Sequence, residues 1–185
     1  MQTVLLVEGE SDRIAIETLA ERRGQNLADI RVVSLGGATN ASKAMADFGP
    51  RGQNLRMAGL CDAGEERFFR SGLDRAGLGS VASREASERL GFFVCVADLE
   101  DELIRVLGVP RVEDVLEQQG DLAGFRVFQN QPFQRERATD TQLHRFLGTT
   151  AGRKAQYARA LVEALDLTAV PRPLAAVLDF ATQAD

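Results

Sequence analysis

The feature that most constrains this chain is an alternation of short apolar runs with helix-like segments through its first 108 residues. The apolar runs are rich in Val, Leu, Ile and Phe, which is typical of strands buried on both faces of a parallel sheet. Helices join such strands in right-handed crossovers. We therefore predict an α/β fold with a four-stranded, mostly parallel sheet flanked by helices, the strands lying at residues 3–7, 30–35, 55–61 and 91–96.

The chain changes character after residue 108. No further apolar strand run appears, and the apolar periodicity predicts only helices, at residues 111–119, 139–147, 153–166 and 172–183. A chain of 185 residues has the length of one domain. We expect residues 1–108 to form the α/β core and residues 109–185 to form a helical C-terminal extension that completes the same domain.

Composition excludes several classes of protein. With 44% hydrophobic and 26% charged residues, the chain is typical of a globular protein and not of a disordered or disulfide-rich one. No apolar run approaches the roughly 18 residues of a membrane span, and the N-terminal segment has no basic start typical of a signal peptide. Cys61 and Cys95 are expected to be buried and reduced, as in a cytoplasmic protein. His144 is the only histidine, which argues against a zinc site or a Ser-His-Asp triad.

Acidic side chains follow three of the four predicted strands. They are Glu8 and Asp12 after the first, Asp62 and Glu66 after the third, and Asp98 and Glu100 after the fourth. Ligands of open parallel sheets bind outside the C-terminal ends of the strands. Carboxylates gathered there repel one another unless a cation neutralises them, and Mg²⁺ or Mn²⁺ suits such oxygens. Each acid alone also fits a helix N-terminus, but acids at three strand ends together favour a metal site.

The charge is distributed unevenly along the chain. The net charge is −5, yet residues 61–121 carry a net −7 and residues 122–160 a net +5. The acidic block suits metal ions and the basic block suits phosphates, although a solvated surface explains the same pattern. The candidate phosphate contacts are Arg135, Arg137, Arg145, Arg153 and Lys154. Most phenylalanines are expected in the core, but Phe128 and Phe133 flank a polar stretch and are also candidates to stack on bases.

The motif VEGESD at residues 7–12 resembles the first motif of the Toprim domain, a Rossmann-like fold shared by topoisomerases, bacterial primases and several nucleases. Glu8 and Asp12 match its two acidic positions, and Asp62 matches the first position of the DxD motif that follows the third strand. Gly64 occupies the second DxD position, a departure that weakens or removes one metal site unless Glu65 or Glu66 supplies an oxygen. The resemblance spans residues 3 to about 105.

Three further segments resemble the Toprim module of OLD-family nucleases. They are LGGATN (35–40), with Ala38 in place of a frequent lysine, DLEDELIRVLG (98–108) and GRKAQYARALVEAL (152–165). The resemblance implies that Glu100 contributes to metal binding and that Lys154 approaches the catalytic centre. An ATPase domain usually precedes this module in OLD proteins. No GxxxxGK[ST] motif occurs here, so we expect no P-loop ATPase in this chain.

The activity that the resemblance implies is a metal-dependent endonuclease, a hydrolase that cleaves or nicks phosphodiester bonds of DNA. One or two Mg²⁺ or Mn²⁺ ions would be held by Glu8, Asp12, Asp62 and Glu100, with Asp98 and Glu66 as further candidates. Glu8 and Lys154 are the expected catalytic residues. Two alternatives remain open: a catalytically weak Toprim subunit that binds nucleic acid or a separate ATPase partner, and an RNA-processing or phosphatase-like Toprim enzyme.

Overall fold

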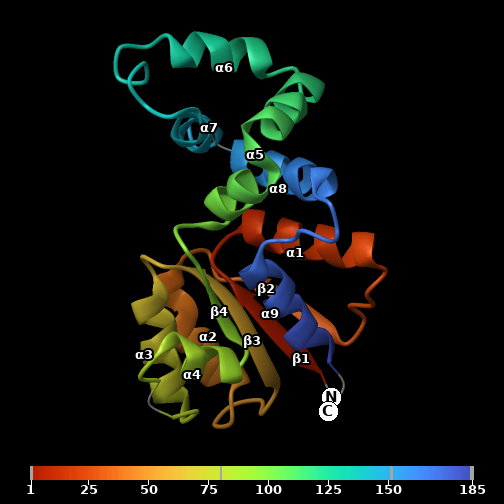
Figure 1. The fold of residues 1–185 in the computed structure, drawn as a ribbon. Helices are drawn as coiled ribbons and strands as arrows, with labels where there is room; N and C mark the ends of the chain where they lie inside the picture. Colours follow the sequence, from red (N-terminus) through yellow and green to blue (C-terminus); the bar gives the residue numbers. More distant parts are fainter. Residues whose placement is uncertain (1, 80, 151, 184–185) are drawn as a thin grey trace.

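The computed structural model of the protein describes residues 2–79, 81–150 and 152–183. Its centre is a sheet of four strands in the order β2-β1-β3-β4, and every pair of neighbours is parallel (Figure 1). The strands are β1 (Thr3–Val7), β2 (Ile30–Ser34), β3 (Arg56–Asp62) and β4 (Phe92–Cys95). The predicted fold class is confirmed.

Helices cover both faces of the sheet (Figure 1). Side chains of β1 alternate between the faces, as the period of a strand requires. Leu5 and Val7 join an apolar cluster with α1 (Glu10–Arg23) and α9 (Arg172–Thr182), whereas Val4 and Leu6 join a second cluster on the opposite face. That second face is covered by α2 (Ala41–Phe48), α3 (Glu66–Ala76) and α4 (Arg84–Arg89), with the short 3-10 turn η1 (Ala38–Asn40) preceding α2.

The chain leaves the C-terminal edge of the sheet through α5 (Leu99–Gln118). Gly108 breaks this helix with a φ of 75°, a left-handed conformation that favours glycine, and Pro110 follows. The break separates the two helices that the sequence predicts at residues 98–108 and 111–119. Beyond it lie α6 (Leu122–Gln129), α7 (Thr139–Leu147) and α8 (Arg153–Ala164). We call residues 99–164 the helical arm; it stands over this edge of the sheet (Figure 1).

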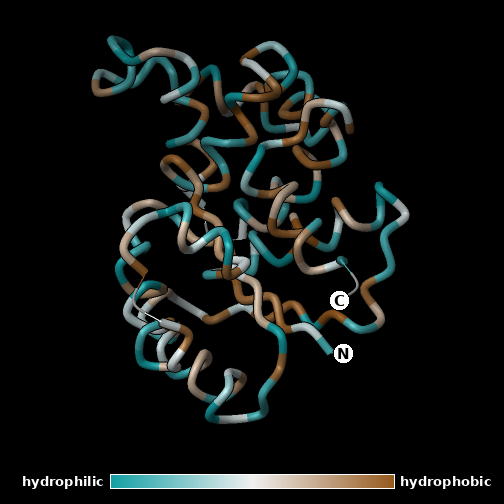
Figure 2. Tube along the Cα trace, turned by 60° about the horizontal axis from the view of Figure 1, so that its bottom comes forward, coloured by the Kyte–Doolittle hydropathy of each residue, from teal (hydrophilic) through white to brown (hydrophobic). Residues whose placement is uncertain are grey.

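One apolar cluster joins the sheet to the helical arm. Tyr157 and Leu161 of α8 belong to the same cluster as Leu5 of the sheet. Phe125 and Phe128 each pack edge-on against Phe146, with ring centroids 5.3 and 5.5 Å apart. Hydropathy along the chain trace places hydrophobic residues on the central strands and hydrophilic residues on the outer turns (Figure 2). Because Phe128 packs against Phe146 inside this apolar cluster, it is a core residue and is no longer a candidate to stack on bases.

Two helices were not expected from the sequence. α4 has six residues and begins at Ser83, whose hydroxyl accepts a hydrogen bond from the Ala86 N–H. α6 has eight residues, too few to give a clear period, and contains Gly124. Short helices of this kind form because tertiary packing stabilises them, so a sequence pattern reveals them poorly. Within the described part of the chain, no helix combines the length and the apolarity needed to cross a membrane.

Candidate metal centre

The side chain of Glu8 reaches from the end of β1 to the end of β3. Its Oε1 accepts a hydrogen bond of 2.7 Å from the backbone N–H of Asp62. The two strands are neighbours in the sheet, so residues that follow them emerge at the same edge. Burial raises the pKa of Glu8, and the charges of Glu65 and Asp98 act in the same direction. Glu8 and Asp62 therefore face a common space, as a shared ion requires.

Asp12 enters this space from the first turn of α1. Its Oδ2 accepts a hydrogen bond of 2.8 Å from the backbone N–H of Gly9, which fixes the carboxylate beside the turn that follows β1. Burial raises the pKa of Asp12 to about 7, although the Gly9 hydrogen bond opposes the shift. The negative charges of Glu100 and Glu8 add to the increase. The carboxylate is therefore partly protonated near neutral pH in the metal-free protein.

Asp62 has the most perturbed carboxylate of the group. Burial, together with the charges of Glu8, Asp12, Asp98 and Glu100, raises its pKa to about 8. Negative charges raise the pKa of a carboxyl group only where they lie close to it. The structure thus brings together five of the six carboxylates that the sequence pattern selected as metal ligands.

Asp98 lies at the start of α5, where its side chain caps the helix. Its Oδ1 accepts a hydrogen bond of 2.8 Å from the Asp101 N–H, and its Oδ2 lies 2.6 Å from Nε2 of His144. Burial alone would raise the pKa of Asp98, but these hydrogen bonds outweigh it and lower the pKa. The hydrogen bond to Asp98 raises the pKa of His144. No local pattern in the sequence predicts this contact, because His144 lies 46 residues further along the chain than Asp98.

Glu100 and Lys154 form an ion pair between α5 and α8. Nζ of Lys154 lies 3.1 Å from Oε2 of Glu100. Burial acts to lower the pKa of Lys154, but the charge and hydrogen bond of Glu100, together with the charges of Asp98 and Asp62, outweigh it and raise the pKa, so the ammonium stays charged. The side chain of Lys154 is still 47% exposed. The second oxygen of Glu100, Oε1, is buried and has no hydrogen-bond partner.

Glu66 does not join the group. Its carboxylate is held by Arg84 at 2.9 Å and by Arg70 at 3.7 Å. Its neighbour Glu65 instead lies close enough for its charge to raise the pKa of Glu8. A Cβ atom at Gly64 would meet no atom within 4 Å. The position of the second DxD residue is therefore open, but this chain has no carboxylate there.

Two of the five candidate phosphate contacts lie beside the carboxylates. Arg145 and Lys154 line a pocket of about 410 Å³, together with Phe128, His144, Gly148 and Thr149. The guanidinium of Arg153 is turned inward instead, 3.5 Å from Asp121 and over the ring of Phe146. Arg135 and Arg137 lie further away, in the loop between α6 and α7. The cations nearest the carboxylates thus come from α7 and α8.

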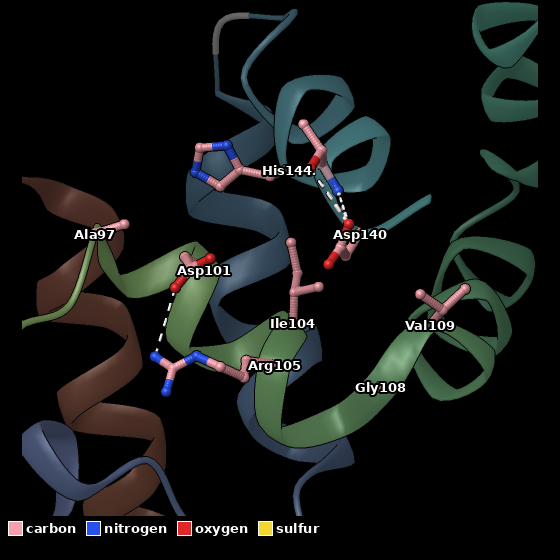
Figure 3. A pocket seen from close by; sticks show the side chains of 9 residues that line it. Ala97, Asp101, Ile104, Arg105, Gly108, Val109, Asp140 and His144 are labelled. Carbon is pink, nitrogen blue, oxygen red and sulfur yellow. Dashed lines mark hydrogen bonds and ion pairs between the residues drawn. The ribbon is translucent and has the colours of Figure 1, made fainter. Parts of the chain in front are cut away.

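A second pocket of about 400 Å³ lies between α5 and α7 (Figure 3). It is lined by Ala97, Asp101, Ile104, Arg105, Gly108, Val109, Asp140, Thr141 and His144. His144 and Asp140 come from α7, while Asp101, Ile104 and Arg105 come from α5 (Figure 3). His144 lines both pockets and touches Asp98, so both pockets lie next to the carboxylate group.

The carboxylates fit a hard divalent cation. All are oxygen donors, Asp12 and Asp62 have pKa values raised by burial and by the charges of neighbouring carboxylates, and Glu100 holds a buried oxygen without a partner among the described residues. Within the described residues, no three His, Cys, Asp or Glu side chains form a ready-made metal cage. Mg²⁺ does not need such a cage, because it binds through few carboxylates and keeps several waters.

The fold and this arrangement of acids define the Toprim class of α/β domains. Residues 1–62 match the family model described as the Overcoming lysogenization defect protein-like TOPRIM domain. The structure resembles the C-terminal region of the Xanthomonas campestris pv. campestris OLD protein, with a TM-score of 0.76, 25% identity, and coverage of 98% of this chain and 92% of that one. The chain has an OLD-like Toprim domain.

A second solved structure supports the fold. The C-terminal region of the Burkholderia pseudomallei OLD protein matches with a TM-score of 0.71 and 22% identity, over 97% of this chain and 96% of that one. No curated protein sequence matches this chain. The structural likeness therefore extends through the helical arm, well beyond the 62 residues that the family model matches.

Proposed function

We propose that this chain is a divalent-metal-dependent nuclease that hydrolyses or nicks phosphodiester bonds of DNA. The observation that carries the proposal is the meeting of carboxylates from three strand ends with the ammonium group of Lys154. OLD-like Toprim domains form a family of nucleases, and this chain has such a domain. Phosphodiester hydrolysis needs negative charge to be neutralised on the attacked phosphate, which a cation site of this kind provides.

Glu8, Asp12, Asp62 and Glu100 are the proposed metal ligands, with Asp98 as a further one. A bound Mg²⁺ or Mn²⁺ supplies a Lewis acid and a more acidic bound water. His144 orients Asp98 through its hydrogen bond of 2.6 Å. The Gly9 N–H orients Asp12, and the Asp62 N–H orients Glu8. The carboxylates of Glu8, Asp12 and Asp98 are thus held in place before any ion binds.

Lys154 is the proposed contact to the reacting phosphate. Its ion pair with Glu100 holds the ammonium at the edge of the carboxylate group, while nearly half of the side chain remains exposed. Arg145 lines the same pocket and adds a second positive charge. Contacts of this type bind the backbone and not the bases, so we expect affinity for DNA that depends on salt and little on sequence.

The test is plasmid nicking with Mg²⁺ or Mn²⁺, with EDTA as the metal-free reference. We expect nicking by the unmodified chain and loss of nicking in Asp62→Asn and in Glu8→Gln. Asp74→Asn is the matched control, because Asp74 is an exposed carboxylate on α3. Nicking that persists in both site variants, or that does not need a divalent ion, contradicts the proposal.

A second function is favoured by Gly64 and Ala38. Gly64 supplies no oxygen at the second DxD position, and Ala38 is 5% exposed where related modules often carry a lysine. Both departures favour a catalytically weak Toprim subunit that binds nucleic acid or a separate ATPase partner. Such a subunit would bind DNA and at most one ion, weakly, and would cleave neither DNA nor RNA in the same assay.

A further inference from the structure

The loop between α6 and α7 displays an aromatic ring to solvent. Phe133 is 85% exposed, more than any other large hydrophobic side chain in the described ranges. Val127, at 69%, also lies in the helical arm. An exposed ring gains little from burial, so Phe133 contributes little to the stability of the fold. The loop lies at the outer end of the helical arm, away from the sheet (Figure 1).

The loop that carries this ring is firmly anchored. The next residue, Gln134, is only 4% exposed, and its backbone carbonyl accepts a hydrogen bond of 2.7 Å from the side chain of Gln142 on α7. The side chain of Gln129 on α6 donates in turn to Gln142, also at 2.7 Å. The ring of Phe133 is thus held outward by a fixed backbone, and binding a flat partner would cost little ordering of the loop.

Two arginines follow Phe133 in the same loop. Nε of Arg137 donates to the carbonyl of Phe133 at 2.9 Å, and Nε of Arg135 donates to the carbonyl of Asn130 at 2.8 Å. Neither guanidinium has a carboxylate within ion-pair distance in the described part of the chain, whereas that of Arg126 on the neighbouring helix is paired with Glu113 at 2.7 Å. The remaining N–H groups of both arginines are free to meet an anion.

The loop leads directly into the helix that reaches the carboxylates. α7 begins at Thr139, and His144 on the same helix touches Asp98. At a rise of about 1.5 Å per residue, the start of α7 lies about 8 Å along the axis from His144. A polyanion bound at the carboxylates is therefore expected to pass within reach of the loop.

We propose that Phe133 is a stacking platform for an unpaired nucleobase, with Arg135 and Arg137 holding the phosphates on either side of it. The chemistry is that of single-stranded DNA binding: an exposed aromatic face, fixed in position, beside unpaired cations. In a duplex the bases already stack on one another and offer no free face. The proposal deepens the proposed function, since it assigns to the same site a substrate with a single-stranded segment next to the cleaved bond.

The chain contains no tryptophan, which makes a direct test simple. Phe133→Trp places the only indole of the protein at the proposed platform. In EDTA, where no cleavage occurs, we expect single-stranded oligothymidine to quench its fluorescence and duplex DNA of the same length to quench it far less. Val127→Trp is the matched control, an exposed position on α6, and we expect it to show little quenching by either DNA.

The second measurement is affinity for the oligothymidine, also in EDTA. We expect Phe133→Ala to weaken it roughly tenfold and Phe133→Tyr to retain it, as base stacking requires. The proposal is overturned by equal quenching with duplex, by unchanged affinity in Phe133→Ala, or by a fluorescence change that follows protein concentration without DNA, which would mark a protein-protein contact. Plasmid nicking is measured separately. If the chain proves not to be a nuclease, the fluorescence and affinity measurements at Phe133 can therefore still be interpreted.

Discussion

The C-terminal edge of the sheet and residues 122–160 of the helical arm carry opposite charge and obtain it in different ways. At the sheet edge, regular strands bring acidic residues from distant parts of the chain into one space, where burial and mutual repulsion raise the pKa values of Asp12 and Asp62. In residues 122–160, several cations such as Arg145 are exposed and have no acidic partner among the described residues. The difference supports the proposals that the edge of the sheet binds a cation and that this part of the arm binds a polyanion.

The largest effect is expected where the two regions meet. Replacing Lys154 by Ala removes the one ammonium that the arm brings to the carboxylates, and we expect the nicking rate to fall about 10²- to 10³-fold. Metal affinity should change little, because Glu100 keeps its oxygens. Lys43→Ala is the control, since Lys43 is the only other lysine and lies exposed on α2. Equal loss in both variants would remove the role assigned to Lys154.

The raised pKa values of the sheet edge predict how stability depends on pH. The unfolded chain releases the protons of Asp12 and Asp62 near pH 4, whereas the folded, metal-free protein holds them up to about 7 and about 8. The contribution of these two groups to the free energy of unfolding is therefore greatest below pH 4 and falls as the pH rises to about 8. Since both groups reach some solvent, we expect a loss on the order of 2 kcal/mol.

Thermal unfolding at pH 5 and pH 8.5 in EDTA measures this loss. Asp62→Asn should be more stable than the unmodified chain at pH 8.5, by a few °C, and should show a smaller dependence on pH. Added Mg²⁺ should restore stability to the unmodified chain above pH 8. A metal-free protein that becomes more stable between pH 5 and pH 8.5 would show that the carboxylates do not repel one another.

Gly64→Asp adds a carboxylate to the C-terminal edge of the sheet and so increases the charge difference between the two regions. A Cβ atom at this position would meet no atom within 4 Å, so the change should be tolerated. We expect affinity for Mn²⁺ to rise severalfold, because the restored DxD pair adds an oxygen donor, and stability without metal to fall slightly. Calorimetric titration and thermal unfolding check the two effects. Unchanged affinity would place Gly64 outside the metal site.

The smallest effect is expected from a single arginine of the arm. Arg145→Ala should weaken DNA binding a few-fold at 100 mM salt and lower the slope of log affinity against log salt by about 1, because one phosphate contact is lost. Arg75→Ala, on the exposed side of α3, should leave both quantities unchanged. Measurement by fluorescence anisotropy at several salt concentrations gives both. The same slope in the unmodified chain and in both variants would show that Arg145 does not contact DNA.

The two regions also differ in how far the sequence predicts them. At the sheet edge, apolar runs and the acids that follow them give the strand ends directly, so Glu8, Asp62 and Asp98 could be placed together before the structure was known. Glu66 was predicted together with them, but one residue along a helix turns a side chain by about 100°, so only packing decides which acid faces the site. Glu66 instead forms an ion pair with Arg84, which lies 18 residues further along the chain.

In the arm, contacts between helices distant in the sequence leave no local pattern. His144 meets Asp98 through packing of α7 on α5, and sequence alone gave it no partner. Phe128 and Phe133 lie in the same polar context in the sequence, yet one is buried and the other is 85% exposed. The sequence therefore gives the strand ends of the metal site, whereas the positions of the arm residues require the tertiary structure.

The most direct test of the central claim is a calorimetric titration of the full chain with Mn²⁺ at pH 7.5, repeated in buffers of different ionisation enthalpy. We predict binding of at least one ion with release of protons from Asp12 and Asp62, and a loss of affinity of at least about tenfold in Asp62→Asn and in Glu8→Gln. No binding by the unmodified chain, or equal binding by all three proteins without proton release, would contradict the claim that these carboxylates share a cation.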